Sequence, residues 1–136
     1  MKYKLCDEEQ KKRSGFVEHI RYLIKQELPI SSEDDMSLLI QYREYYLQIS
    51  FSEVHPLMMF SLAKTYPESQ IEIRYRKLNE LNRKSILGTH ALNEELACYT
   101  YRATHWLDAN LDLWRFLEIL DRCVDEADRG YNELMK

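Results

Sequence analysis

The stretch MSLLIQYREYYLQISF, residues 36–51, decides the fold because its apolar residues recur at every second position. Such alternation places one set of side chains on one face of a β-strand. The two apolar sets are Met36, Leu38, Ile40 and Tyr42, and then Tyr45, Leu47, Ile49 and Phe51. The polar pair Arg43 and Glu44 separates them and predicts a hairpin turn. A third apolar stretch at residues 57–63 extends the pattern to a three-stranded meander.

Helical spacing precedes and follows this meander. Residues 7–28 carry one apolar stripe and end before Pro29, which predicts a first helix, and the polar residues 31–35 predict a loop. Ser69 and Glu72 have the spacing of a capping box, so a second helix is expected from near Gln70 to residues 82–85.

The remainder of the chain predicts two more strands and a long helix. The strands are expected at residues 86–91 and 96–104, with a turn at residues 93–95. The final helix is expected over residues 111–134, with Asp108 or Asn110 as its N-cap and fraying at Gly130. Its apolar stripe is predicted to bury Leu113, Phe116, Leu117, Leu120 and Val124.

These elements follow one another in the order α-β-β-β-α-β-β-α. The order predicts an α+β fold with one mainly antiparallel five-stranded sheet and helices packed on it. A length of 136 residues is that of one domain, so we expect a single domain over residues 1–136.

Composition narrows the function classes. The chain holds 19 Lys and Arg against 23 Asp and Glu, and this net charge of −4 argues against a nucleic-acid partner. The N-terminal residues carry no secretory signal, and no apolar run reaches the length of a membrane span. Cys6, Cys98 and Cys123 are widely spaced, as is typical of free thiols in a reducing compartment. A cytoplasmic protein without a membrane partner is expected.

Motifs of catalysis and of metal or cofactor binding are missing from the sequence. It contains no Gly-x-Ser-x-Gly, no Gly-rich phosphate loop and no His-Glu-x-x-His. His19, His55, His90 and His105 stand apart, without the spacing of metal ligands. We therefore expect no enzyme activity, no cofactor and no metal.

One motif resembles a known family. Leu78-Asn79-Glu80-Leu81-Asn82 at the end of the second helix, Gly88 in a short strand and Tyr99-Thr100-Tyr101-Arg102 in the next resemble the bacterial YbjN family. The element order resembles that of the small acidic type III secretion chaperones, which share the YbjN fold. Where such proteins commonly place an aromatic residue after the glycine, this chain has Thr89 and His90.

The resemblance implies a protein-interaction or sensory-transduction role without catalytic residues. A secretion-chaperone relative implies a homodimer that holds an extended stretch of a partner polypeptide. The family-motif residues are expected to be mainly structural, namely Leu78, Asn79, Leu81, Asn82 and Gly88. Asn79 and Asn82 share a helix face, where their amides either bond locally near the helix end or read a partner's backbone.

The alternation also predicts a partner-binding surface. Tyr46 is out of phase with the apolar set of its strand and should share the outer sheet face with Leu39 and Met59. Such a cluster suits a dimer or peptide surface, while cover by a helix or ordinary scattered exposure is the alternative. A second candidate is the basic cluster on and after the second helix, either a solvated face or a patch for an acidic partner: Arg74, Arg76, Lys77, Arg83 and Lys84.

Together these observations predict a non-enzymatic, chaperone-like interaction or regulatory module that binds a polypeptide on a sheet face or edge. A small-ligand-binding regulatory domain, with a pocket between the sheet and the C-terminal helix, is the alternative.

Overall fold

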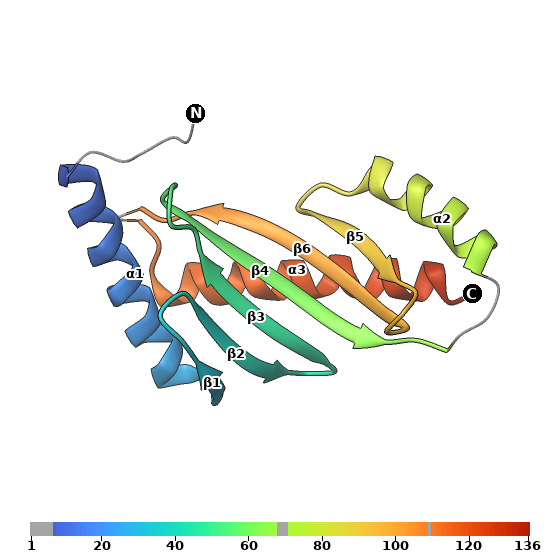
Figure 1. Cartoon of the computed structure of the whole chain (residues 1–136), viewed down its shortest axis with the longest axis horizontal. Helices are drawn as coiled ribbons and strands as arrows, with labels where there is room; N and C mark the ends of the chain where they lie inside the picture. Colours follow the sequence, from blue (N-terminus) through green and yellow to red (C-terminus); the bar gives the residue numbers. More distant parts are fainter. Residues whose placement is uncertain (1–6, 68–70, 109) are drawn as a thin grey trace.

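The computed structural model describes residues 7–67, 71–108 and 110–136. Within these residues, three helices and six strands follow one another (Figure 1). In order they are α1 (Asp7–Glu27), β1 (Ile30–Glu33), β2 (Ser37–Tyr42), β3 (Tyr45–Phe51), β4 (Leu57–Thr65), α2 (Ile71–Lys84), β5 (Gly88–Asn93), β6 (Cys98–Trp106) and α3 (Leu113–Leu134).

The strands form one antiparallel sheet in the order β1-β2-β3-β4-β6-β5. The α+β class and the meander are therefore confirmed, and the hairpin turns at Arg43, which adopts a positive φ of 53°. The sheet has six strands and not five, because β1 occupies the segment predicted as a loop. This edge strand is short and polar, and only Ile30 is half-buried in it, so it shows no apolar alternation.

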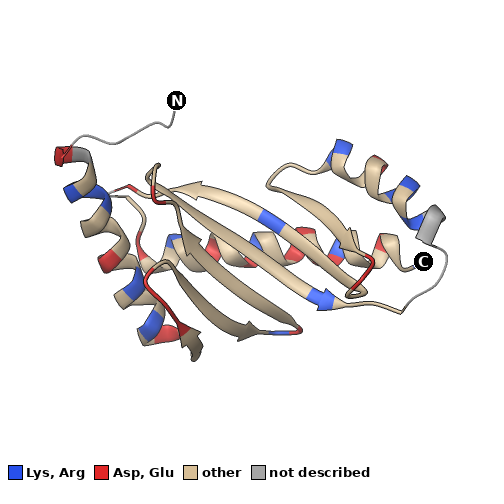
Figure 2. Cartoon of the chain, viewed as in Figure 1, with Lys and Arg blue, Asp and Glu red and all other residues tan. Residues whose placement is uncertain are grey.

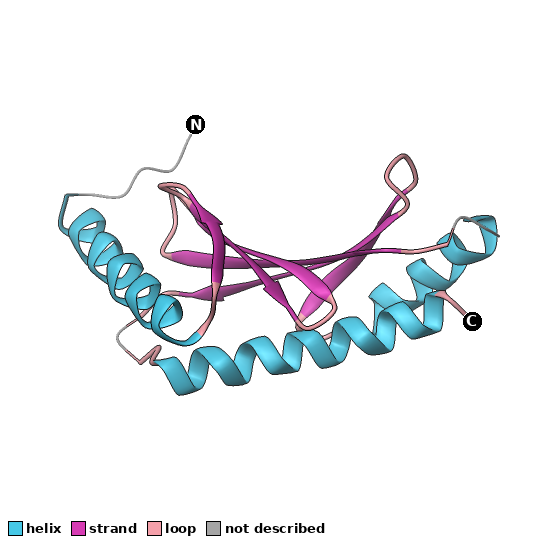
Figure 3. Cartoon of the chain, turned by 90° about the horizontal axis from the view of Figure 1, so that it is seen from below, coloured by secondary structure: helices cyan, strands magenta, loops and turns pink. Residues whose placement is uncertain are grey.

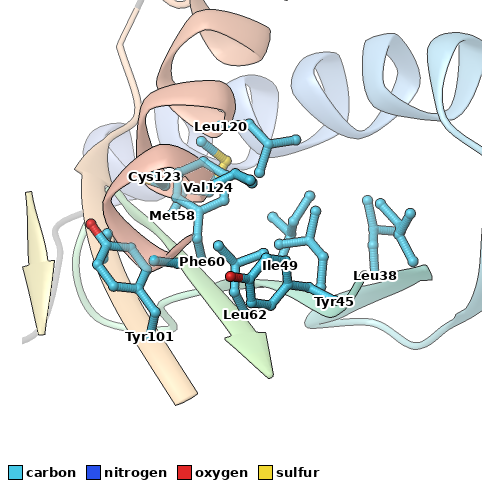
Figure 4. Packing of buried hydrophobic residues seen from close by; sticks show 14 of the residues in the cluster. Leu38, Tyr45, Ile49, Met58, Phe60, Leu62, Tyr101, Leu120, Cys123 and Val124 are labelled. Carbon is cyan, nitrogen blue, oxygen red and sulfur yellow. The ribbon is translucent and has the colours of Figure 1, made fainter. Parts of the chain in front are cut away.

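Helix α3 runs along one face of the sheet, with α1 near one end of α3 and α2 near the other (Figure 3). The inward-facing strand residues meet α3 in a continuous apolar core, as the close view shows for Phe60, Tyr101 and Leu120 (Figure 4). Of the predicted stripe on α3, Phe116, Leu120 and Val124 are buried, whereas Leu113 and Leu117 are half-buried because they lie at the margin of the contact.

The boundaries differ from the predictions at three places. The N-cap of α3 is Asp112, whose Oδ1 accepts from Arg115 N at 2.8 Å, because Asp108 closes a separate turn before the helix. Residues 86 and 87 precede β5, and the β5–β6 turn ends at Ala97 with φ 46°. The proposed cap at Ser69 lies outside the described residues.

Candidate functional site

The sheet face opposite α3 carries no helix within the described part of the chain (Figure 3). Strand register sets which residues line this open face. One row across it runs through Gln41, Tyr46, Ala63, Thr100 and Ala91, each paired with the next. A second row runs through Leu39, Gln48, Ser61, Arg102 and Thr89. The face is therefore built of small, polar and a few large apolar side chains.

Charge is sparse on the open face. Charged residues are concentrated in the helices and connecting segments (Figure 2). Among the β2–β6 residues that register places on this side, Arg102 is the only charged one. Its Nη2 lies 3.2 Å from Met59 Sδ, a weak acceptor that leaves most of the guanidinium donors available.

The three residues predicted from alternation all lie on the open face. Tyr46 is 61% exposed and Leu39 is 39% exposed, and they are diagonal neighbours because Leu39 pairs with Gln48. Met59 is half-buried and pairs with Ser50, so β3 separates it from Leu39. Sequence reasoning missed Trp106, which is 59% exposed at the end of β6, because the predicted strand stopped at residue 104.

The β5 edge of the sheet is closed by side chains. The Asn82 amide donates to His90 O at 2.9 Å and accepts from His90 N at 2.8 Å, as a neighbouring strand would. Gly88 N, on the same edge, donates to Glu126 Oε1 at 3.0 Å. The Asn82 side chain therefore does not bond to a neighbouring carbonyl of its own helix, and its backbone is not in the left-handed region. Asn79 on the same helix is exposed.

The β1 edge is closed in another way. The strand is four residues long and its register with β2 shifts between Ile30 and Ser32. Arg21 and Lys25 of α1 both pair with Glu33 at its end, at 2.8 and 2.6 Å. Short, irregular and charged edges resist pairing with another strand.

A buried polar cluster lies on the α3 side of β5 and β6. Glu126 of α3 accepts hydrogen bonds from the backbone N–H groups of Ile86, Leu87 and Gly88 at 3.0–3.4 Å, and from the Tyr101 hydroxyl at 2.9 Å. Burial alone would raise the pKa of Glu126, but these donors hold it below its ordinary value. The carboxylate therefore fixes the 85–88 strap, our name for the segment that follows α2 and ends at the first residue of β5.

His90 lies beside this cluster. Its Nδ1 is 2.5 Å from the Tyr99 hydroxyl, and its Nε2 is buried without a hydrogen-bond partner among the described residues. Burial lowers the pKa of His90 and raises that of Tyr99, so burial favours the neutral form of both side chains.

Two glycines make room for these aromatic side chains. A Cβ on Gly130 would lie under 3.0 Å from the His90 ring, and a Cβ on Gly88 would lie under 3.0 Å from Arg102 O and Tyr101. Gly130 is buried, and α3 continues past it to Leu134. The prediction that the helix frays at Gly130 is therefore wrong.

The remaining candidate residues from the sequence do not form one site. Within the basic cluster, Arg74 is buried against the Tyr66 ring and donates to Pro67 O, while Lys77 donates to Lys136 O. Leu78 and Leu81 pack against the core. The described residues contain no group of three or more His, Cys, Asp or Glu side chains placed to hold a metal ion.

Comparisons with known proteins concern the family and the fold of this chain. The family model YbjN, described as "Putative bacterial sensory transduction regulator", matches residues 20–136. The crystal structure of YbjN from E. coli, described as "a putative transcription regulator", is similar with a TM-score of 0.65 and 11% identity, covering 84% of this chain and 87% of that one.

A chain of the HopA1–SchA chaperone–effector complex is similar with a TM-score of 0.54 and 7% identity, covering 85% of this chain and 95% of that one. At these identities the likenesses show a shared, chaperone-like fold. No curated protein matches the sequence. Within the described residues no helix combines the length and apolar content of a membrane span.

Proposed function

Because this chain belongs to the YbjN family, we propose that it is a non-enzymatic regulatory module that binds a partner polypeptide over the open face of its sheet. The observation that carries the proposal is the charge-poor open face. Depletion of charge together with exposed aromatic residues is typical of the centre of a protein interface. Tyr46 and Trp106 supply those aromatic side chains.

The closed edges favour the face over strand addition. Asn82 already occupies the hydrogen-bonding groups of His90 on β5, and a strand added at β1 would meet a bulge and the Glu33 ion pairs. A partner that adds a strand would have to displace these contacts, whereas the face is accessible without rearrangement.

The chemistry of the face describes the partner segment. Small side chains such as Ala63, Ser61 and Thr100 permit close approach along the middle of the sheet. Arg102 offers a charge-assisted hydrogen bond to a carboxylate or carbonyl near the centre. The expected partner is therefore an extended segment, largely apolar, with one acceptor or acidic residue opposite Arg102.

The similar HopA1–SchA structure is that of a chaperone–effector complex, and this likeness of fold supports a polypeptide partner here. We further propose that the protein lies in the bacterial cytoplasm and that it is a homodimer when no partner is bound. Two copies meeting over the open face would form an isologous contact, which a two-fold dimer requires, and the partner would replace the second copy on that face.

Site-specific photo-crosslinking tests the proposal. A benzophenone amino acid is placed at Tyr46 and, as a matched control, at Tyr22 of α1, which is 62% exposed and lies outside the sheet. Crosslinking in cells of the source bacterium should give discrete adducts from position 46 and none from position 22. An adduct of twice the chain mass would identify the dimer, and a different mass would identify another polypeptide. No adduct from position 46, or the same adducts from both positions, would contradict the proposal.

A further inference from the structure

A cavity of about 480 Å³ lies between the C-terminal halves of α2 and α3, beside the 85–88 strap. It is not the predicted pocket between the sheet and α3, because core side chains fill that space. Most of its lining is apolar, with Leu81 on α2 and Ile86 on the strap among the lining residues. It lies on the α3 side of the sheet, so an inference drawn from it is independent of the open face.

Cations line this cavity in an otherwise acidic protein. Lys84, Arg129 and Lys136 all contribute to its lining. Lys136 is paired at 3.0 Å with Glu133, which also lines the cavity, whereas Lys84 and Arg129 have no carboxylate within 4.0 Å among the described residues. Glu126 also lines the cavity, but four donors already occupy its carboxylate. Lys84 and Arg129 are therefore available to bind an anion.

The carbonyl groups at the C-terminus of α2 offset only part of the positive charge of these cations. A helix C-terminus presents unsatisfied carbonyl groups that disfavour anions. At this end, Leu81 O accepts both from Ser85 N and from Ser85 Oγ, each at 3.0 Å. At the end of α3, Lys136 O accepts from Lys77.

His90 forms part of the cavity lining and brings a polar atom without a partner. The Tyr99 hydroxyl donates to Ala127 O at 3.2 Å, so Nδ1 carries the proton in its contact with the Tyr99 oxygen and Nε2 is an acceptor. An ionised carboxylate has no proton to donate to Nε2, so His90 contributes to the cavity wall and does not bind the charged group of a ligand.

We propose that this cavity binds a small organic carboxylate with an aliphatic body. Lys84 and Arg129 bind the carboxylate, and Leu81 and Ile86 contact the aliphatic chain. An apolar cavity with a few convergent polar groups is the usual form of a small-molecule site. The site would make the module responsive to a metabolite.

A titration of the full chain with hexanoate, followed by two-dimensional amide NMR, tests the proposal, and 1-hexanol is the uncharged probe. Hexanoate should saturably shift the signals of Ile86, Leu87 and Gly88, and hexanol should leave them unchanged. Lys84→Gln with Arg129→Gln should weaken hexanoate binding about tenfold, as expected for a lost charge-assisted contact. The control pair Arg76→Gln with Arg83→Gln removes the same charge from α2 outside the cavity and should change the affinity less than about twofold.

Absence of saturable shifts, equal shifts with hexanol, or equal losses in the two double variants would each overturn the proposal.

Discussion

Gly130 is the residue where one missing methyl group matters most. A Cβ there would overlap the His90 ring, so Gly130→Ala should lower the free energy of unfolding by about 1–3 kcal/mol, although alanine has the better helix propensity. Chemical denaturation followed by circular dichroism measures the change.

Gly15 provides the matched control, because it also lies within a helix but has no atom within 4 Å of an added Cβ. Gly15→Ala should raise the free energy of unfolding by up to about 1 kcal/mol. Stabilisation by both substitutions would show that His90 does not occupy the space above Gly130.

Asn82 is the second residue with a specific role. Asn82→Ala removes both hydrogen bonds to the backbone of His90, so we expect a loss of about 1–3 kcal/mol in the free energy of unfolding. Asn79→Ala, on the exposed side of the same helix, should change it by less than about 0.5 kcal/mol. Thermal unfolding of the two variants should separate them clearly, and equal shifts would contradict the assigned contact.

Among the elements, the 85–88 strap depends on pH through Glu126. The folded pKa of this carboxyl lies below its ordinary value of 4.5, so its stabilising contribution is present above that value and disappears as the pH falls through the folded pKa. Glu126→Gln should lower the free energy of unfolding by about 1–3 kcal/mol at neutral pH, and the difference from wild type should shrink in acid.

Urea denaturation at a series of pH values measures this difference. Asp125→Asn, at the exposed neighbouring position, removes the same charge and should change the free energy of unfolding by less than about 0.5 kcal/mol. A difference for Glu126→Gln that stays constant from neutral pH into acid would contradict the assignment.

Elements that bury one face were predictable from the sequence. Strands β2 and β3 alternate because register places every second residue in the core, and α3 shows its stripe for the equivalent reason. The polar edge strand β1 has no such constraint. The contacts of Asn82 and Glu126 join residues 8 and about 40 positions apart, which no local pattern encodes. The open face was predictable in part, since phase alone assigned Tyr46 and Leu39 to it.

For the whole molecule, self-association through the open face is the central prediction. Tyr46→Asp places a charge in an apolar contact and should convert a dimer into a folded monomer. Light scattering measures the mass and circular dichroism the fold. A wild-type mass of 16.5 kDa at micromolar concentration would contradict the dimer. A Tyr46→Asp protein that is still dimeric would place the dimer contact elsewhere.

The closed edges of the sheet have a consequence for how far association can proceed. A contact that pairs one edge with the opposite edge of the next copy repeats with each added copy, so it propagates into a fibre. A molecule has one open face, and a two-fold contact between two such faces uses up both. With Asn82 on one edge and a short, charged β1 on the other, we expect assembly of this protein to be self-terminating even at high concentration.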